Sequence, residues 1–519
     1  MPSLPVLSAE KLNLRTAIGQ LIVPRASGFL LNHQRLYPHW ELDWASLERA
    51  VTEYGIGGVL LYSGSLGDTH LKIEQLAALA DIPLLVCADL EAGCGQHIRG
   101  ATRLPTARAI GETRSRELAY QCGALTAREA RAVGFNWVLA PCLDVNTNPD
   151  NPVICLRSFG EDPVVVADLG SAFSAGVRSE GVLSTAKHFP GHGDVAVDSH
   201  LSLPVVERTR QQLAIEDWLP FERVIAQGVD AVMSAHLLVP ELDPDWPATL
   251  SRYVLTDVLR GKMNCQGLIV TDALTMGAVS GQPDLGVLAL DAGADVLLMP
   301  ADVGVCLHEI ESAVLSGKLN EQRIYTSAQR VLDAKARVCG PRPGLLAVGG
   351  PEAEALHADV ARTCLQVVRD REGLLPLSPD GSVINILLVD ACLASPVQAD
   401  SPLLRPTSPH RTHWLEAGHE ESYVRYLLSQ CDRDVVLVHA LTPVQAYRGT
   451  NALHVAGEML LTGLCAQARP TVLISYTNPY LARFFPQIST VINAFNDSRP
   501  SQDAVFARLH GLRDCTLTV

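Results

Sequence analysis

The amino-acid sequence predicts an α/β protein of two domains, in which a (β/α)8 TIM-type barrel precedes a smaller α/β sandwich. Three observations lead to this prediction. Short apolar runs alternate with amphipathic stretches through the first part of the chain, which is typical of parallel strands and their crossover helices. At 519 residues the chain exceeds what one hydrophobic core usually serves. Proline and glycine accumulate at 341–350, and a second set of apolar runs comes after them.

The barrel strands are expected at apolar runs that each end in a polar or small residue. Between them, the stretch 113–134, "TRSRELAYQCGALTAREARAVG", has helical spacing and ends at a glycine, Gly134. This alternation favours a barrel over an open sheet. The runs lie at 55–62, 82–89, 135–144, 183–189, 230–236, 267–272 and 294–300.

The two domains are expected at 1–340 and 351–519, with a linker at about 341–350. In the second domain a helix should begin near Pro351, and its later strands should form a flavodoxin-like layered sandwich. Neither a GxGxxG motif nor a phosphate-binding P-loop is present there, so no nucleotide role is indicated. The strands are expected at 383–390, 434–441, 471–476 and 490–496.

Charge and cysteine content restrict the class of partner. The net charge of −15 argues against a nucleic-acid surface and against adsorption on an anionic membrane, whereas a small substrate is compatible. The 13 cysteines are scattered without a CxxC pair, which indicates buried thiols in a reducing compartment. With neither a signal peptide nor a membrane span in the sequence, a cytoplasmic location is expected. The oligomeric state is not indicated.

Polar residues at the predicted strand ends form the first functional signal. Five of the runs have such a residue or pair at or near their end: Asp89, Asp144, Lys187 with His188, His236 and Asp272. The carboxyl ends of barrel strands carry the active site. Any one of these residues also fits a helix N-cap, but a set of mixed charge that includes lysine and histidine does not.

The stretch "KHFPGHGDVAVDSH" (187–200) allows either a metal site or a proton relay. His188 and His192 are four residues apart, but Pro190 with its neighbouring glycines breaks a helix, and Lys187 opposes a cation. No metal is therefore expected. Asp198 and His200 share a face of an extended segment, where a carboxylate orients an imidazole as a general acid/base. The alternative is a surface turn.

Asp272 ends the most apolar run of the chain, "GLIVTD". A carboxylate at this place can act as a nucleophile, a general base or a metal ligand. A strand-end glutamate that would complete the two-carboxylate set of most glycosidases is not evident in the sequence.

These motifs resemble those of bacterial β-N-acetylhexosaminidases in glycoside hydrolase family 3. The stretch 187–200 is very similar to the family signature. Other stretches resemble further family blocks in family order, and the resemblance extends into the second domain. They are "QLIV" near Gln20, "VLAPCLDVNTNPDNPVICLRSFGEDP" (138–163), "VMSAHLLVP" (232–240) and "GLIVTDALTMGAV" (267–279).

The resemblance implies a retaining exo-β-N-acetylglucosaminidase without a cofactor. Asp272 would form a covalent glycosyl-enzyme, and His200, oriented by Asp198, would be the acid/base. The implied substrate is a small carbohydrate, a terminal N-acetylglucosamine on a peptidoglycan-derived muropeptide. The residues that would bind the sugar are Asp89, Arg157, Lys187 and His188.

One block departs from the commonest family pattern. Where many relatives read D-Q-E-G-G-R-V-x-R, this chain reads "DLEAGCGQHIRG" (89–100), so the sugar-contacting arginine falls on His97, with Arg99 two residues on. Four alternatives to this N-acetylglucosaminidase remain open. One is a phosphorylase, because a histidine repels phosphate less than a carboxylate does. The others are a β-glucosidase-type hydrolase of the same family, a metal-dependent hydrolase, which insensitivity to a chelator would exclude, and a non-catalytic sugar-binding protein, which the presence of all three candidate catalytic residues disfavours.

Overall fold

The computed structural model describes residues 8–338, 340–391, 396–431, 435–442 and 452–512. The chain divides into two compact units. The first, here the barrel unit, comprises Met1–Leu104, Arg114–Ile154 and Ser158–Glu354. The second, the sandwich unit, comprises Pro105–Thr113, Cys155–Arg157 and Ala355–Val519. The domain boundary expected at 341–350 stays a prediction, and the two short inserted segments of the sandwich unit were not anticipated from the sequence.

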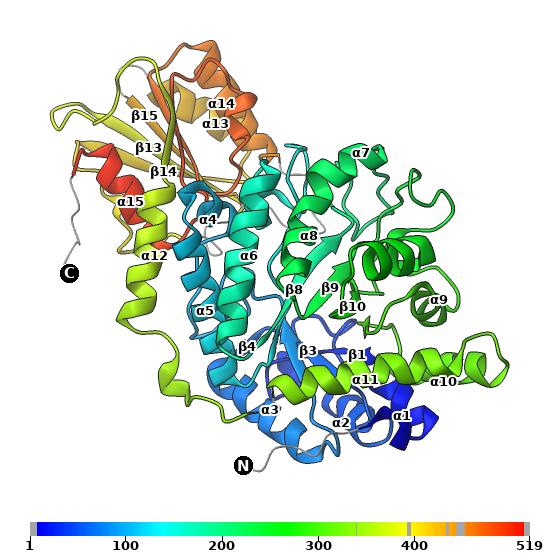
Figure 1. Ribbon diagram of the computed structural model, residues 1–519. Helices are drawn as coiled ribbons and strands as arrows, with labels where there is room; N and C mark the ends of the chain where they lie inside the picture. Colours follow the sequence, from blue (N-terminus) through cyan, green and yellow to red (C-terminus); the bar gives the residue numbers. More distant parts are fainter. Residues whose placement is uncertain (1–7, 339, 392–395, 432–434, 443–451, 513–519) are drawn as a thin grey trace. The chain divides into compact units, whose positions relative to one another are not determined.

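The strands of the barrel unit are all parallel to their neighbours. Seven form one sheet in the order β10-β9-β8-β7-β5-β3-β2. They are β2 (Arg25–Ser27), β3 (Gly58–Tyr62), β5 (Leu85–Ala88), β7 (Trp137–Val138), β8 (Leu183–Phe189), β9 (Ala231–Ser234) and β10 (Leu268–Thr271). Figure 1 shows β8, β9 and β10 in the interior of this unit, with helices on the outside.

Two further short strands close the sheet into a barrel. β11 (Leu297–Leu298) pairs with β1 (Ile22–Val23), and a parallel bridge joins Val270 of β10 to Val296 just before β11. Only Pro24, which has no N–H to donate, separates β1 from β2, so the two count as one interrupted strand. The fold class predicted from the sequence is confirmed.

Helices connect successive strands, and their ends follow the sequence closely. Helix α5 lies at Arg116–Val133, within the predicted stretch, and Gly134 ends it with a φ of +124°. The Ser115 side chain caps its start by accepting the Leu118 N–H. α5 packs closely on α6 (Pro163–Ser179), because a Cβ at Gly123 would lie 2.1 Å from the Phe173 carbonyl oxygen.

The remaining barrel-unit α-helices lie outside the strands. They are α1 (Leu14–Gly19), α2 (Trp44–Thr52), α3 (Leu66–Leu79), α7 (Arg210–Gln212), α8 (Trp218–Ala226), α9 (Leu285–Ala292), α10 (Val303–Leu315) and α11 (Glu321–Val338). None of the helices in the described ranges combines the length and the apolar character that crossing a membrane requires.

The sandwich unit contains a sheet in the order β12-β17-β16-β15-β13-β14, parallel except for β12. Its parallel strands, numbered along the chain, follow the order 2-1-3-4-5, which is the flavodoxin-like order expected from the sequence. The strands are β12 (Gln366–Asp370), β13 (Val383–Val389), β14 (His410–Glu416), β15 (Val435–Ala440), β16 (Thr471–Ser475) and β17 (Thr490–Asn493).

Helices cover both faces of this sheet. One apolar core joins the sheet to α13 (Glu421–Gln430) and α14 (Val455–Ala466), and the other joins it to α15 (Arg499–Leu509). α12 (Pro351–Cys364) begins at the predicted residue. The inserted segment with α4 (Ala107–Thr113) belongs to this unit, because Thr106 donates to the Phe495 carbonyl at 2.8 Å and Arg108 to the Tyr480 hydroxyl at 3.0 Å.

A buried carboxylate ties the start of β11 to the outer helices. Asp295, whose side chain is fully buried, pairs with Arg260 at 2.6 Å, Arg330 at 2.9 Å and Arg323 at 3.2 Å, and accepts from Ser327 at 2.6 Å. Burial alone would raise the pKa of Asp295, but the three guanidinium groups lower it overall. Asp295 lies at the amino ends of the barrel strands, which is the face of a barrel associated with stability.

Replacing this carboxylate should therefore destabilise the barrel unit. We expect Asp295→Asn to lower the free energy of unfolding by about 3–5 kcal/mol, because three guanidinium groups lose their shared buried partner. Urea unfolding followed by tryptophan fluorescence measures the change. Glu311→Ala, which removes an exposed ion pair with Arg15, is the matched control and should cost less than about 1 kcal/mol. Equal losses for the two variants would contradict the role given to Asp295.

Candidate active site

The residues selected from the sequence gather at the carboxyl ends of the barrel strands. Asp89 directly follows β5, Lys187 and His188 lie near the end of β8, and Asp272 directly follows β10. His236 lies two residues beyond β9. The peptide bonds Lys187–His188 and Phe189–Pro190 are both cis. The face expected to carry the active site is therefore the one on which these side chains meet.

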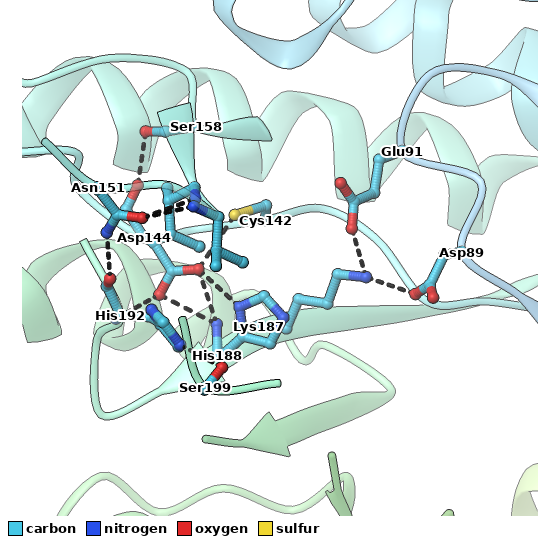
Figure 2. A network of polar contacts seen from close by, with 12 residues as sticks. Asp89, Glu91, Cys142, Asp144, Asn151, Ser158, Lys187, His188, His192 and Ser199 are labelled. Carbon is cyan, nitrogen blue, oxygen red and sulfur yellow. Dashed lines mark hydrogen bonds and ion pairs between the residues drawn. The ribbon is translucent and has the colours of Figure 1, made fainter. Parts of the chain in front are cut away.

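Lys187 carries its charge into the barrel between two carboxylates. Its side chain is 1% exposed, and its Nζ lies 2.5 Å from Asp89 Oδ1 and 2.5 Å from Glu91 Oε1. Figure 2 shows the ammonium group between the two acids. Asp89 is the more open of the two acids, at 26% exposed against 8% for Glu91. Tyr62, the last residue of β3, donates its hydroxyl to the other oxygen of Asp89.

Glu91 and Tyr62 are site residues that the sequence reasoning missed. Glu91 lies two residues after Asp89 in the same stretch, a spacing that could have drawn attention to it. Tyr62 ends a predicted strand, and nothing in the sequence around it signals a contact with Asp89.

Asp144 organises the histidines that follow Lys187. Its Oδ2 lies 2.7 Å from His188 Nδ1, and its Oδ1 accepts the His192 backbone N–H at 2.6 Å. Burial acts to raise the pKa of Asp144, but the charge and hydrogen bond of His188 outweigh it and the pKa is lowered. An ionised Asp144 accepts a proton-bearing Nδ1, which fixes the His188 ring (Figure 2). His192 Nε2 contacts Ser199 Oγ at 2.8 Å, so the His192 ring joins two parts of the loop.

Cys142, Asp144 and His188 bring three potential metal-ligand atoms within 4.8 Å of one another. The Cys142 sulfur lies 3.0 Å and the His188 Nδ1 2.7 Å from the same Asp144 oxygen. Two nitrogen or oxygen ligands of a tetrahedral zinc ion keep roughly 3.3 Å apart, given bonds of about 2.0 Å. The observed separations therefore fit hydrogen bonds better than a ligand set.

Asp198 and His200 form the contact expected of an acid/base dyad. They lie in a turn, and not in the extended segment that was expected, because the Leu201 N–H donates back to the Asp198 carbonyl at 3.0 Å. Asp198 Oδ1 lies 2.8 Å from His200 Nδ1 and accepts the His200 backbone N–H at 2.9 Å. The Asp198 side chain is fully buried, whereas that of His200 is 19% exposed. The carboxylate therefore holds the ring by Nδ1 and leaves the Nε2 side of the imidazole for proton transfer.

The dyad loop, residues 190–201, is bound to the segment that follows Asp272. Gly277 donates its N–H to the His200 carbonyl at 3.1 Å, and Ala278 donates to the Ser199 carbonyl at 3.3 Å. A Cβ at position 277 would lie 2.8 Å from the His200 carbonyl oxygen, so this close approach requires glycine. The loop therefore brings the histidine from β8 to the side of the barrel on which β10 ends.

Asp272 is held as an anion. Its Oδ1 accepts the Ala273 N–H at 2.7 Å. Burial acts to raise the pKa of Asp272, but His188, His236, the Ala273 N–H and His200 act against it and lower the pKa to about 2. The structure thus brings Asp272, His188 and His200 into one electrostatic neighbourhood.

His236 supports the turn behind Asp272. The ring is fully buried, with Nδ1 2.9 Å from Thr249 Oγ1 and Nε2 donating to the Ala273 carbonyl at 3.0 Å. Its hydrogen bonds therefore go to the surrounding protein and fix the residue next to Asp272.

The structure brings His97, and not Arg99, to the neighbourhood of Asp89. The His97 ring packs edge-on against Tyr62 at 4.3 Å between centroids, whereas Arg99 is exposed beside Phe29. Burial lowers the pKa of His97 to about 4, opposed by Asp89 and Glu91, so its imidazole is neutral at pH 7. The cation that packs on the Tyr62 ring is the Arg25 guanidinium, 4.3 Å from the ring centroid.

Arg157 lies in the short 3-10 turn Cys155–Arg157, a segment of the sandwich unit. Its predicted contact with the sugar stays a prediction.

Arg208 clamps the start of the dyad loop. It donates to Asp194 at 2.9 Å and to Thr147 at 2.6 Å, and it pairs with Glu216 and, at 3.5 Å, with Asp217. Asp217 is buried against Gly191, where an added Cβ would lie 2.7 Å from the Asp217 Cβ. Burial raises the pKa of Asp217 to about 7, although Arg208 acts to lower it.

Comparisons with known proteins show which family the sequence matches. The model of the glycosyl hydrolase family 3 N-terminal domain matches residues 13–334. Beta-hexosaminidase A of Pseudoalteromonas piscicida is 32% identical over 66% of this chain and 64% of its own length, so the chain spans just under two thirds of that relative. A beta-N-acetylglucosaminidase/beta-glucosidase of Cellulomonas fimi is 26% identical over 88% of this chain and 86% of its own.

A solved structure has the same fold over nearly its whole length. The family 3 beta-N-acetylglucosaminidase from Paenibacillus sp. str. FPU-7 superposes with a TM-score of 0.83 at 27% identity, covering 97% of each chain.

The raised pKa of Asp217 predicts a pH-dependent cost to stability. Between pH 4 and 7 the folded protein holds a proton at Asp217 that the unfolded chain, with a pKa near 3.8, releases. Stability therefore falls as pH rises through this window. Asp217→Asn removes this titration. The free energy of unfolding of the variant minus that of the unsubstituted protein should therefore rise with pH, by at most about 1.4 kcal/mol per pH unit between pH 4 and 7. Urea unfolding at several pH values measures the gap, and a gap independent of pH would contradict the prediction.

Proposed function

Because the chain belongs to glycosyl hydrolase family 3, we propose that it is a retaining exo-β-N-acetylglucosaminidase that removes non-reducing terminal N-acetylglucosamine. The observation that carries the proposal is the dyad loop, which joins Asp198 and His200 to the segment following the anionic Asp272. The names of the hexosaminidase and N-acetylglucosaminidase relatives support the same sugar.

Asp272 acts as the nucleophile in this proposal. Its Oδ1 accepts the Ala273 N–H, so the other oxygen attacks the anomeric carbon. As that bond forms, the bond from the anomeric carbon to the leaving oxygen breaks. The proposed product is a glycosyl-aspartate ester with inverted configuration, and a second inversion by water restores the original one.

His200 moves the proton in both steps. Its Nε2 gives a proton to the leaving oxygen in the first step and takes one from water in the second. Asp198, held on Nδ1, stabilises the imidazolium and keeps the ring oriented. A histidine thus takes the place of the carboxylic acid of most glycosidases.

Sugar recognition is assigned to Asp89, Lys187, His188 and Arg157. Asp89 is a hydrogen-bond acceptor and the others are donors, a combination that suits the hydroxyl and acetamido groups of the sugar. Lys187 and His188 arrive already oriented by Glu91 and Asp144.

We further propose a cytoplasmic enzyme that acts on peptidoglycan-derived fragments. All the cysteines within the described residues are free thiols, which supports a reducing compartment. Phosphorolysis is the second candidate, since an imidazole acid/base repels an incoming phosphate less than a carboxylate does.

Turnover of nitrophenyl glycosides tests the sugar and the nucleophile. We expect release of nitrophenol from the β-N-acetylglucosaminide in preference to the β-glucoside, unchanged by a chelator. Asp272→Ala should lose at least about 10³-fold in kcat, because the covalent route is removed, whereas Asp291→Ala, an exposed aspartate on α9, should not. Preference for the glucoside, or an active Asp272→Ala enzyme, would overturn the assignment. A rate that rises with phosphate and yields a sugar phosphate would identify a phosphorylase.

The role of the dyad can be tested separately, by comparing substrates with poor and good leaving groups. His200→Ala should lower kcat by about 10²–10⁴-fold for a disaccharide, whose poor leaving group needs the proton. The loss should be smaller in the glycosylation step with a nitrophenyl substrate, because nitrophenolate leaves without being protonated. Asp198→Asn should show the same trend. His308→Ala, an exposed histidine on α10, is the control. Equal losses for both leaving groups in that step would mean that His200 is not the acid.

A further inference from the structure

The Asp89 carboxylate is held from two sides by two different strands. Lys187 Nζ of β8 contacts Oδ1 at 2.5 Å, and the hydroxyl of Tyr62, at the end of β3, donates to Oδ2. A carboxylate oxygen has two lone pairs, so each oxygen of Asp89 keeps one for a further donor. The two contacts together fix the direction in which those remaining lone pairs point.

The ring of Tyr62 is itself fixed by its neighbours. The Arg25 guanidinium lies over it at 4.3 Å from the centroid, and the His97 ring meets it edge-on at 4.3 Å with an interplanar angle of 76°. Arg25 is held in turn between further aromatic rings, with its Cζ 4.8 Å from the centroid of Tyr37 and 5.9 Å from that of Trp40. Cation–π and edge-to-face contacts of this kind hold the phenol where its hydroxyl reaches Asp89.

We infer that Tyr62 is a substrate-positioning residue, which turns the Asp89 carboxylate so that its two remaining lone pairs accept two hydroxyl groups of the terminal sugar. This inference rests on the proposed function and deepens it, because it assigns hydroxyl selectivity to a residue that does not contact the reacting atoms. The neutral His97, in the place where the family pattern has an arginine, packs on this tyrosine and supplies no charge to the sugar. Arg25 contributes by fixing the ring.

A hydrogen bond that orients a binding group affects substrate binding more than the chemical step. Tyr62→Phe removes one oxygen atom and keeps the ring that Arg25 and His97 contact. We expect KM for the nitrophenyl β-N-acetylglucosaminide to rise about 10-fold, the value of one hydrogen bond to a charged group, with kcat changed less than about three-fold. Tyr120→Phe removes the hydroxyl of an exposed tyrosine on α5, outside this cluster, and should leave both constants unchanged.

A double-variant cycle separates this role from a structural one. Because Tyr62 acts through Asp89, Tyr62→Phe combined with Asp89→Asn should raise KM no further than Asp89→Asn alone. A purely structural effect would instead multiply the two losses. Calorimetric binding of N-acetylglucosamine to the same variants gives a second readout, in which the affinity should fall by the same factor as KM rises.

The outcomes also distinguish the two proposals. An unsubstituted enzyme that turns over neither glycoside would end the proposed function. An active unsubstituted enzyme with a Tyr62→Phe variant of equal KM and equal N-acetylglucosamine affinity would end the inference on Tyr62 alone. Independent, multiplying losses in the cycle would also end it.

Discussion

The buried charge of Lys187 is the constraint on which the proposed sugar-binding side of the site depends. An ammonium group that is 1% exposed needs close partners of opposite charge, because transferring it out of water is otherwise prohibitive. Asp89 and Glu91 supply them, and this requirement fixes the loop after β5 relative to the end of β8. The carboxylates outnumber the cation, so the cluster retains acceptor capacity, and the more open Asp89 presents it. The proposed recognition of hydroxyl groups by Asp89 then depends on an ion pair that the buried Lys187 needs in any case.

The proposed reaction centre is assembled differently, by a hydrogen-bonded loop. Asp272 belongs to the barrel ring, whereas the dyad lies in a loop that leaves β8 and returns over the end of β10. That loop holds its shape through hydrogen bonds at several points: Asp144 with the His192 N–H, Ser199 with the His192 ring, and Gly277 with the His200 carbonyl. Arg208 anchors its start through Asp194. The proposed centre thus combines an aspartate fixed at the end of a barrel strand with a dyad whose loop is hydrogen-bonded to the segment that follows that aspartate.

Much of this arrangement was predictable from the sequence. Continuous apolar runs identified most barrel strands, and the polar residues at their ends identified Asp89, Lys187, His188 and Asp272, because a buried parallel strand has a simple pattern. β1 and β2 were missed since Pro24 interrupts them and each is only two or three residues long. β12 and β14 were missed for another reason. They are edge strands, and the polar run "HRTHWLE" of β14 carries little of the apolar signal of its neighbours.

The partners of the site residues were harder to predict, because pairing across strands is not encoded locally. Asp144 was recognised at a strand end, but its link to His188, forty-four positions away, depends on how β7 and β8 align. The same holds for Glu91 with Lys187 and for Tyr62 with Asp89. For His97 the sequence indicated the position but not the charge state. Counting along the motif placed it where relatives have an arginine, and only its burial shows that it is neutral. A motif assigns a position, but the charge at that position depends on the solvent and the neighbours that the fold provides.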